Sequence, residues 1–126
     1  MSTNLEQILE EIDTAEIAIV KDKPDMGVVI FTRPTPKEFR AYRKAVQKLE
    51  TAQAKLADDD VEGVLKLGED TNGLVVAYAK KHAIRVEGVG DVSTVPQLFA
   101  KPSLAVHMGK RFQEEAAQLL PPLLRS

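Results

Sequence analysis

The sequence predicts one α+β domain over residues 1–126, in which an N-terminal helix and a β-hairpin precede a long helix and a small C-terminal helical bundle. Two short β-branched runs lie near the N-terminus, a capped amphipathic stretch follows them, and the rest of the chain has helical patterns. A chain of 126 residues with 44% hydrophobic content is sufficient for one core. Strands grouped before helices, without alternation, are typical of the α+β class.

The N-terminal part predicts a helix over residues 4–13 and then the hairpin. Thr3 and Glu6 form a capping-box pattern at the start of this helix. Its apolar residues recur at helical spacing: Leu5, Ile8, Leu9 and Ile12. The β-branched runs Glu16–Lys21 and Gly27–Arg33 then flank a turn-forming Asp-Lys-Pro-Asp cluster, which predicts two antiparallel strands.

The long helix is predicted over residues 36–57. Thr35 as N-cap, Pro36 at the first helical position and Glu38 at the third together form a strong helix start. One stripe at spacings of three and four follows, interrupted once by a glutamine: Phe39, Tyr42, Val46, Leu49, Gln53 and Leu56. We expect this stripe to face the core.

The C-terminal half predicts a succession of shorter helices. Asp58–Asp60 cap a short helix over 60–67, a Gly-rich turn occupies 68–73, and a buried helix covers 74–82. The glycine-punctuated segment 86–92 indicates a loop. A capping pattern at Thr94 predicts a single helical turn that ends near Lys101, and Pro102 opens a final helix that ends at Pro121-Pro122.

Composition excludes several classes of function. The net charge of −2 does not favour a nucleic-acid binder, which is usually strongly basic. Cysteine is absent, so disulfides, thiolate nucleophiles and Cys-based zinc sites are excluded. The sequence has no apolar run of membrane-spanning length, and its N-terminus is acidic and unlike a signal peptide. We expect a cytoplasmic protein that does not bind a membrane.

No catalytic or metal-binding motif is complete. His82 and His107 stand 25 residues apart, and the acidic run Asp58–Asp60 lacks the spacing of a calcium loop. Gly88-Val-Gly90 is only half of a dinucleotide fingerprint. The sequence therefore predicts no enzyme, no catalytic residue, no metal and no cofactor.

Two features suggest protein binding, and each has a structural alternative. Basic residues recur along the long helix at spacings of three and four: Lys37, Arg40, Lys44 and Lys48, with Arg43 alongside. They form either a solvated face or a docking surface for an acidic partner. Strand Val28–Phe31 is apolar on both faces, so it is covered either by the helices of this chain or by another chain, which would be a second copy or a client.

The order of these features resembles a known family. The second strand runs into Arg33-Pro-Thr-Pro-Lys-Glu-Phe-Arg-Ala-Tyr-Arg43, and the chain later has Pro96-Gln-Leu-Phe99 and Pro102-Ser-Leu104. Over roughly residues 15–118 this pattern resembles the tail assembly chaperones of long-tailed bacteriophages, prophages and gene-transfer elements. The resemblance implies a non-enzymatic protein of the host cytoplasm that self-associates and binds the tape-measure protein, with tail-tube subunits as a further client.

The candidate interface is a groove between the hairpin and the long helix. Val29 and Phe31 would contribute from the hairpin, and Arg40, Arg43 and Lys44 would form the rim. Helix-in-groove binding and strand addition are the two modes of recognition that such a site would support. The alternative function is a small phage or bacterial structural or adaptor protein that binds one folded protein partner.

Overall fold

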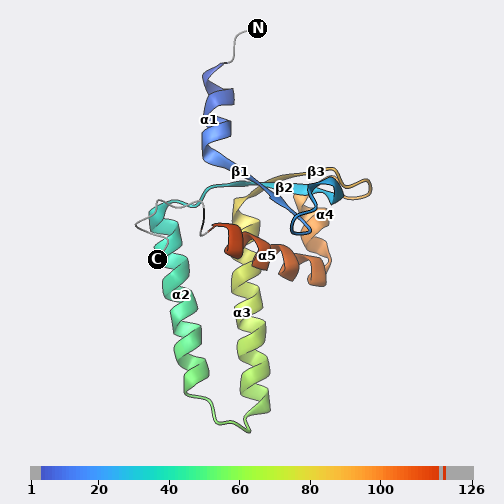
Figure 1. Ribbon diagram of the computed structural model, residues 1–126. Coiled ribbons are helices and arrows are strands. Elements are labelled where there is room, and N and C mark those ends of the chain that lie inside the picture. The colour runs from blue at the N-terminus through green and yellow to red at the C-terminus, as the bar shows by residue number, and fades with distance from the viewer. Residues whose placement is uncertain (1–3, 117, 119–126) are drawn as a thin grey trace.

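The computed structural model describes residues 4–116 and residue 118, and it confirms an α+β fold with a long helix and C-terminal helices (Figure 1). A small antiparallel sheet lies between α1 on one side and the helices α2, α3 and α5 on the other. The elements in chain order are α1 (Leu5–Asp13), β1 (Thr14–Ala18), the 3-10 helix η1 (Pro24–Met26), β2 (Val28–Thr32), α2 (Pro36–Ala54), α3 (Val61–His82), β3 (Ala83–Glu87), α4 (Val95–Ala100) and α5 (Pro102–Ala116). Thr3 and Pro121-Pro122, which were predicted to bound the first and last helices, lie outside the described residues.

The sheet has three strands in the order β1-β2-β3, so the predicted two-stranded hairpin is incomplete. Val29 in the middle strand pairs with Ile17 on one side and with Val86 on the other. The segment 86–92 was predicted to be a loop because of its glycines; residues 88–92 are indeed outside the helices and strands, whereas Val86 and Glu87 belong to β3. Strand β3 forms because it pairs with β2, a contact between residues more than fifty positions apart that local sequence patterns do not report.

Helix α3 is one continuous helix of 22 residues, where the sequence predicted two helices joined by a turn. Gly68 and Gly73 suggested the turn, but both lie inside the helix, and a Cβ added at either position would meet nothing within 4 Å. Glycine in a helix interior costs about 1 kcal/mol, which packing of the helix ends can offset. Asp60 caps the start of α3, as predicted, because its Oδ1 accepts a hydrogen bond of 2.9 Å from the Gly63 amide.

Helix α2 begins as the sequence predicted. The Thr35 hydroxyl accepts a hydrogen bond from the Glu38 amide at 3.1 Å, and the Glu38 carboxylate accepts one from the Thr35 amide at 3.0 Å. The predicted core stripe is less buried than expected: Tyr42 is buried, whereas Phe39 and Val46 are half-buried. Among the residues of this stripe, Tyr42 is therefore the one that belongs to the buried core, with Val46 packed against it.

The core lies between the sheet and α5. Its largest fully buried side chains come from β2, α4 and α5: Val29, Phe31, Leu98, Met108 and Phe112. The rings of Phe31 and Phe112 stack with centroids 4.4 Å apart. Gly109 allows α5 to approach α3 closely, since a Cβ at this position would lie 2.6 Å from Val75 Cγ1.

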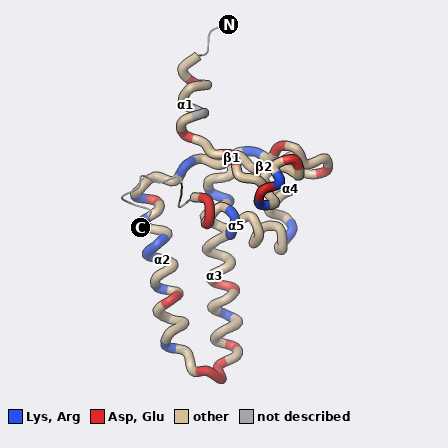
Figure 2. The backbone as a smooth tube through the Cα atoms, viewed as in Figure 1, with Lys and Arg blue, Asp and Glu red and all other residues tan. Residues whose placement is uncertain are grey.

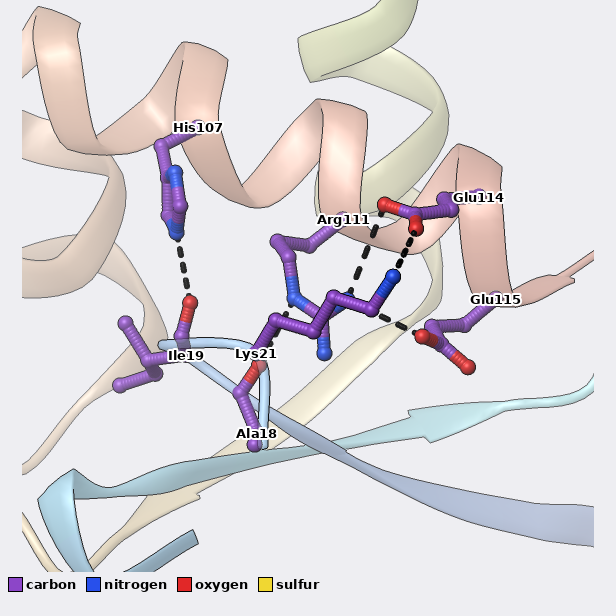
Figure 3. Close-up of polar contacts among 7 residues, drawn as sticks. All are labelled: Ala18, Ile19, Lys21, His107, Arg111, Glu114 and Glu115. Atoms are coloured by element: carbon purple, nitrogen blue, oxygen red, sulfur yellow. Dashed lines mark hydrogen bonds and ion pairs between the residues drawn. The ribbon is translucent and has the colours of Figure 1, made fainter. Parts of the chain in front are cut away.

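Polar side chains of α5 fix the end of β1 (Figure 3). His107 Nε2 donates a hydrogen bond of 2.6 Å to the Ile19 carbonyl, and Arg111 Nε donates one of 3.1 Å to the Ala18 carbonyl. Arg111 is 7% exposed, and its charge is balanced by Glu115 at 3.0 Å. These contacts hold β1, an edge strand, against the core.

Candidate binding groove between two helices

Helices α2 and α3 run antiparallel and leave an open groove between them. Alanine, leucine and tyrosine side chains form its apolar floor: Ala41, Tyr42, Ala45, Leu74, Ala77 and Tyr78. Lys37, Glu38 and Lys81 lie at one end, and the groove encloses about 570 Å³. Three alanines on the floor leave room for the side chains of another helix, so the shape suits the helix-in-groove mode of recognition.

Two stacked tyrosines form the deepest part of the floor. The rings of Tyr42 and Tyr78 lie 3.9 Å apart at 11°, and the Tyr42 hydroxyl donates a hydrogen bond of 2.9 Å to Gln113 on α5. Burial raises the pKa of both hydroxyls, so both are neutral at physiological pH. The Tyr78 hydroxyl is buried without a hydrogen-bond partner among the described residues. The centre of the floor is thus buried, aromatic and uncharged.

An ionic cluster closes the end of the groove nearest the sheet. Glu38 lies 3.1 Å from Lys81 Nζ and 3.4 Å from His82 Nε2. The backbone amide of Thr35, the nearby lysine and the Thr35 hydroxyl outweigh partial burial and lower the pKa of Glu38 to about 2. Glu38 therefore stays ionised and neutralises Lys81.

His82 connects this cluster to the sheet and is 4% exposed. Its Nδ1 lies 2.8 Å from the Thr32 hydroxyl, and burial lowers its pKa although Glu38 acts in the opposite direction. The order Thr32, His82, Glu38 resembles the nucleophile, base and acid of a hydrolase. Neither Thr32 nor His82 lines the groove, however. Because the His82 imidazole is buried, it cannot contact a substrate bound there. The three residues instead tie the start of α2 to the end of α3.

The structure separates the residues that were predicted to form the interface. Val29 and Phe31 are fully buried in the middle strand, so their assignment to a binding surface is wrong; β3 covers the strand edge and α5 covers the face. Arg40, Arg43 and Lys44 are exposed on α2, as expected of rim residues. The groove itself lies between α2 and α3, whereas the prediction placed it between the hairpin and α2.

Only one of the three predicted rim residues lies beside this groove. At 100° per residue, Lys44 falls next to Ala41 and Ala45, whereas Arg40 and Arg43 lie further round α2. Lys37, Lys44 and Lys48 follow one another along this flank, and we call these three residues the basic rim. Figure 2 shows the basic positions that follow α2 and the acidic positions at the α2–α3 connection.

Sequence reasoning missed the floor of the groove. Ala41 and Ala45 are four residues apart, beside the expected core stripe, and Leu74, Ala77 and Tyr78 repeat at helical spacing. These spacings could have indicated a second apolar face on each helix. Because the sequence predicted two helices in place of α3, the apolar face that α3 turns towards α2 was not recognised. The two apolar faces oppose each other only when α3 is continuous.

No protein-family model, curated protein or solved structure matches the chain. Within residues 4–116, no group of three or more potential metal-ligating side chains occurs. Across the same part of the chain, no helix combines the length and apolar character needed to cross a membrane.

Proposed function

We propose that this chain is a non-enzymatic protein of the tail assembly chaperone type that holds a helical segment of a tape-measure protein in the α2–α3 groove. Tail-tube subunits are a further class of client, and the host cytoplasm is the compartment. The observation that carries this proposal is the apolar groove floor of alanine, leucine and tyrosine side chains beneath a basic rim.

The dimensions of the groove support a helical client. The groove lining runs from Lys37 to Ala45 on α2 and from Leu74 to Lys81 on α3, which is eight and seven positions along the helix, or about two helical turns and roughly 10–12 Å. A client helix with apolar residues at i, i+3, i+4 and i+7 presents a stripe of the same length. A tape-measure protein is a long helical chain with such stripes, and covering them before assembly would prevent aggregation.

The experiment measures the affinity of this protein for helical peptides taken from a phage tape-measure protein, by calorimetry or fluorescence anisotropy. Ala45→Glu places a charge on the groove floor and is expected to weaken binding by about tenfold or more, because the carboxylate would be desolvated against an apolar stripe. The matched control is Gln47→Glu, which adds the same charge on the exposed opposite face of α2 and is expected to leave affinity unchanged.

Two results would contradict the proposal. Equal affinity of the Ala45→Glu and Gln47→Glu variants would place the client elsewhere on the protein. Absence of binding to any tape-measure peptide, with binding instead to one folded protein, would favour the adaptor function.

A further inference from the structure

Helix α1 lies outside the body of the protein and has an uncovered apolar stripe. In Figure 1 it extends from the sheet on the side opposite α2 and α3. Its large apolar side chains are 46–69% exposed: Leu5, Ile8, Leu9 and Ile12. They occupy positions i, i+3, i+4 and i+7, so they form one stripe about two turns long. A helix of nine residues is too short to be stable alone in water, so it needs a surface to pack on.

The groove of the same molecule is out of reach of α1. Asp13 ends the helix and Thr14 begins β1, so no linker separates the two elements. Arg33 fixes this junction: its amide donates a hydrogen bond of 2.8 Å to the Asp13 carbonyl, and its Nε donates one of 3.3 Å to the Thr14 carbonyl. Since α1 cannot fold back across the sheet, any groove that receives it belongs to another molecule.

Charge selects among the possible partners of α1. Its sequence, LEQILEEID, has four acidic residues and no basic residue. Two α1 helices would therefore repel each other, and an anionic membrane surface would repel α1, since helices that bind such surfaces are rich in lysine and arginine. The basic rim of the α2–α3 groove has the opposite charge, and Lys37 in this rim forms no ion pair with the described residues.

We propose that the α1 helix of one copy docks into the α2–α3 groove of a second copy, with its apolar stripe on the alanine floor and with Glu6 and Asp13 against the basic rim. The stripe extends over seven positions from Leu5 to Ile12 and the groove over seven to eight, about two helical turns each, so their lengths match. The contact is between different surfaces, so it closes in a pair when exchanged reciprocally and otherwise extends to larger assemblies. It rests on the same groove as the proposed function, and α1 and a client helix compete for that groove.

Crosslinking tests the contact directly because the natural chain has no cysteine. Full-length Leu9→Cys and Ala45→Cys variants are mixed and treated with a short bismaleimide, and the products are identified by mass spectrometry. We expect a crosslink between Leu9→Cys of one copy and Ala45→Cys of another. The control mixture replaces Ala45→Cys with Gln47→Cys, on the opposite face of α2, and is expected to give none.

Sedimentation velocity at tens of micromolar provides the second measurement. Ile8→Glu, in the stripe, is expected to weaken self-association by about tenfold or more, whereas Gln7→Glu on the polar face is expected to preserve it. Gln7 accepts a hydrogen bond from the Asn4 amide through its side-chain oxygen, and a glutamate can do the same, so the control keeps the helix cap.

Three outcomes would overturn the proposal: a wild-type monomer over this range, a dominant crosslink between two Leu9→Cys chains, or equal self-association of the Ile8→Glu and Gln7→Glu variants. The proposed function fails separately. Loss of the α1 contact with retained, Ala45-dependent peptide binding would leave the client site intact. If α1 still docks into the groove but no tape-measure peptide binds, only the proposed client is contradicted, and the contact between copies stands.

Discussion

At the residue scale, a few polar side chains determine how α2 and α3 are joined. Thr35 and Glu38 cap α2 reciprocally, and Glu38 also contacts Lys81 and His82 at the end of α3. His82 in turn contacts Thr32 at the end of β2. This chain of contacts sets the spacing of the two helices at the closed end of the groove, so changes here are expected to affect stability and groove shape together.

Loss of the Thr35 cap should destabilise the protein measurably. Thr35→Ala removes the hydrogen bond to the Glu38 amide and is expected to lower the free energy of unfolding by about 1 kcal/mol, measured by urea denaturation. The control is Thr51→Ala at an exposed position inside α2, where alanine is the better helix former. Equal losses in the two variants would contradict the capping role.

Stability should fall with acid in two steps because both Glu38 and His82 have pKa values below their ordinary ones. In the folded state burial holds the His82 pKa below 6.5, so the unfolded chain takes up the proton first and stability decreases as pH falls below about 6.5. The pKa of Glu38 is about 2 against an ordinary 4.5, so its contribution is lost as pH falls from 4.5 towards 2.

The measurement is denaturant unfolding at a series of pH values for the wild type and for His82→Gln. The variant is expected to be less stable at pH 7.5 and to lose less stability between pH 7 and 5.5, because glutamine does not titrate. Identical pH slopes for the two proteins would contradict a neutral, buried His82.

At the element scale, the sequence predicted the starts of helices better than their continuity. The caps at Thr35, Asp60 and Thr94 are present, because a cap depends on residues three positions apart. The continuity of α3 and the existence of β3 depend on contacts between distant segments, α3 with α5 and β3 with β2. The α2–α3 groove was not predicted for the same reason, since its floor comes from two helices that face each other only when α3 is unbroken.

Gly73 on α3 and Gly109 on α5 provide opposite tests of how these two helices pack. Gly73→Ala, with open space around the added methyl group, is expected to stabilise the protein by about 0.5–1 kcal/mol. Gly109→Ala is expected to destabilise it, because the methyl group would overlap Val75 Cγ1 and crowd the α3 backbone. Thermal melts compare the two variants. A destabilised Gly73→Ala would indicate the turn that the sequence first suggested.

At the scale of the whole molecule, the protein consists of a compact core with two protruding helical parts. The core of sheet, α4 and α5 contains all five of the largest fully buried side chains. The α2–α3 pair extends from one side of the sheet and α1 from the other, and both expose apolar residues. An arrangement with apolar surface concentrated on protruding helices suits a protein whose partners are other helices.

Hydrogen–deuterium exchange with and without a tape-measure peptide tests the central claim most directly. We expect slower amide exchange in the groove segments, residues 37–48 of α2 and 74–82 of α3, and unchanged exchange in the strands β1 and β3. Slower exchange confined to an edge strand, with none in α2 or α3, would contradict the account and indicate strand addition to the sheet.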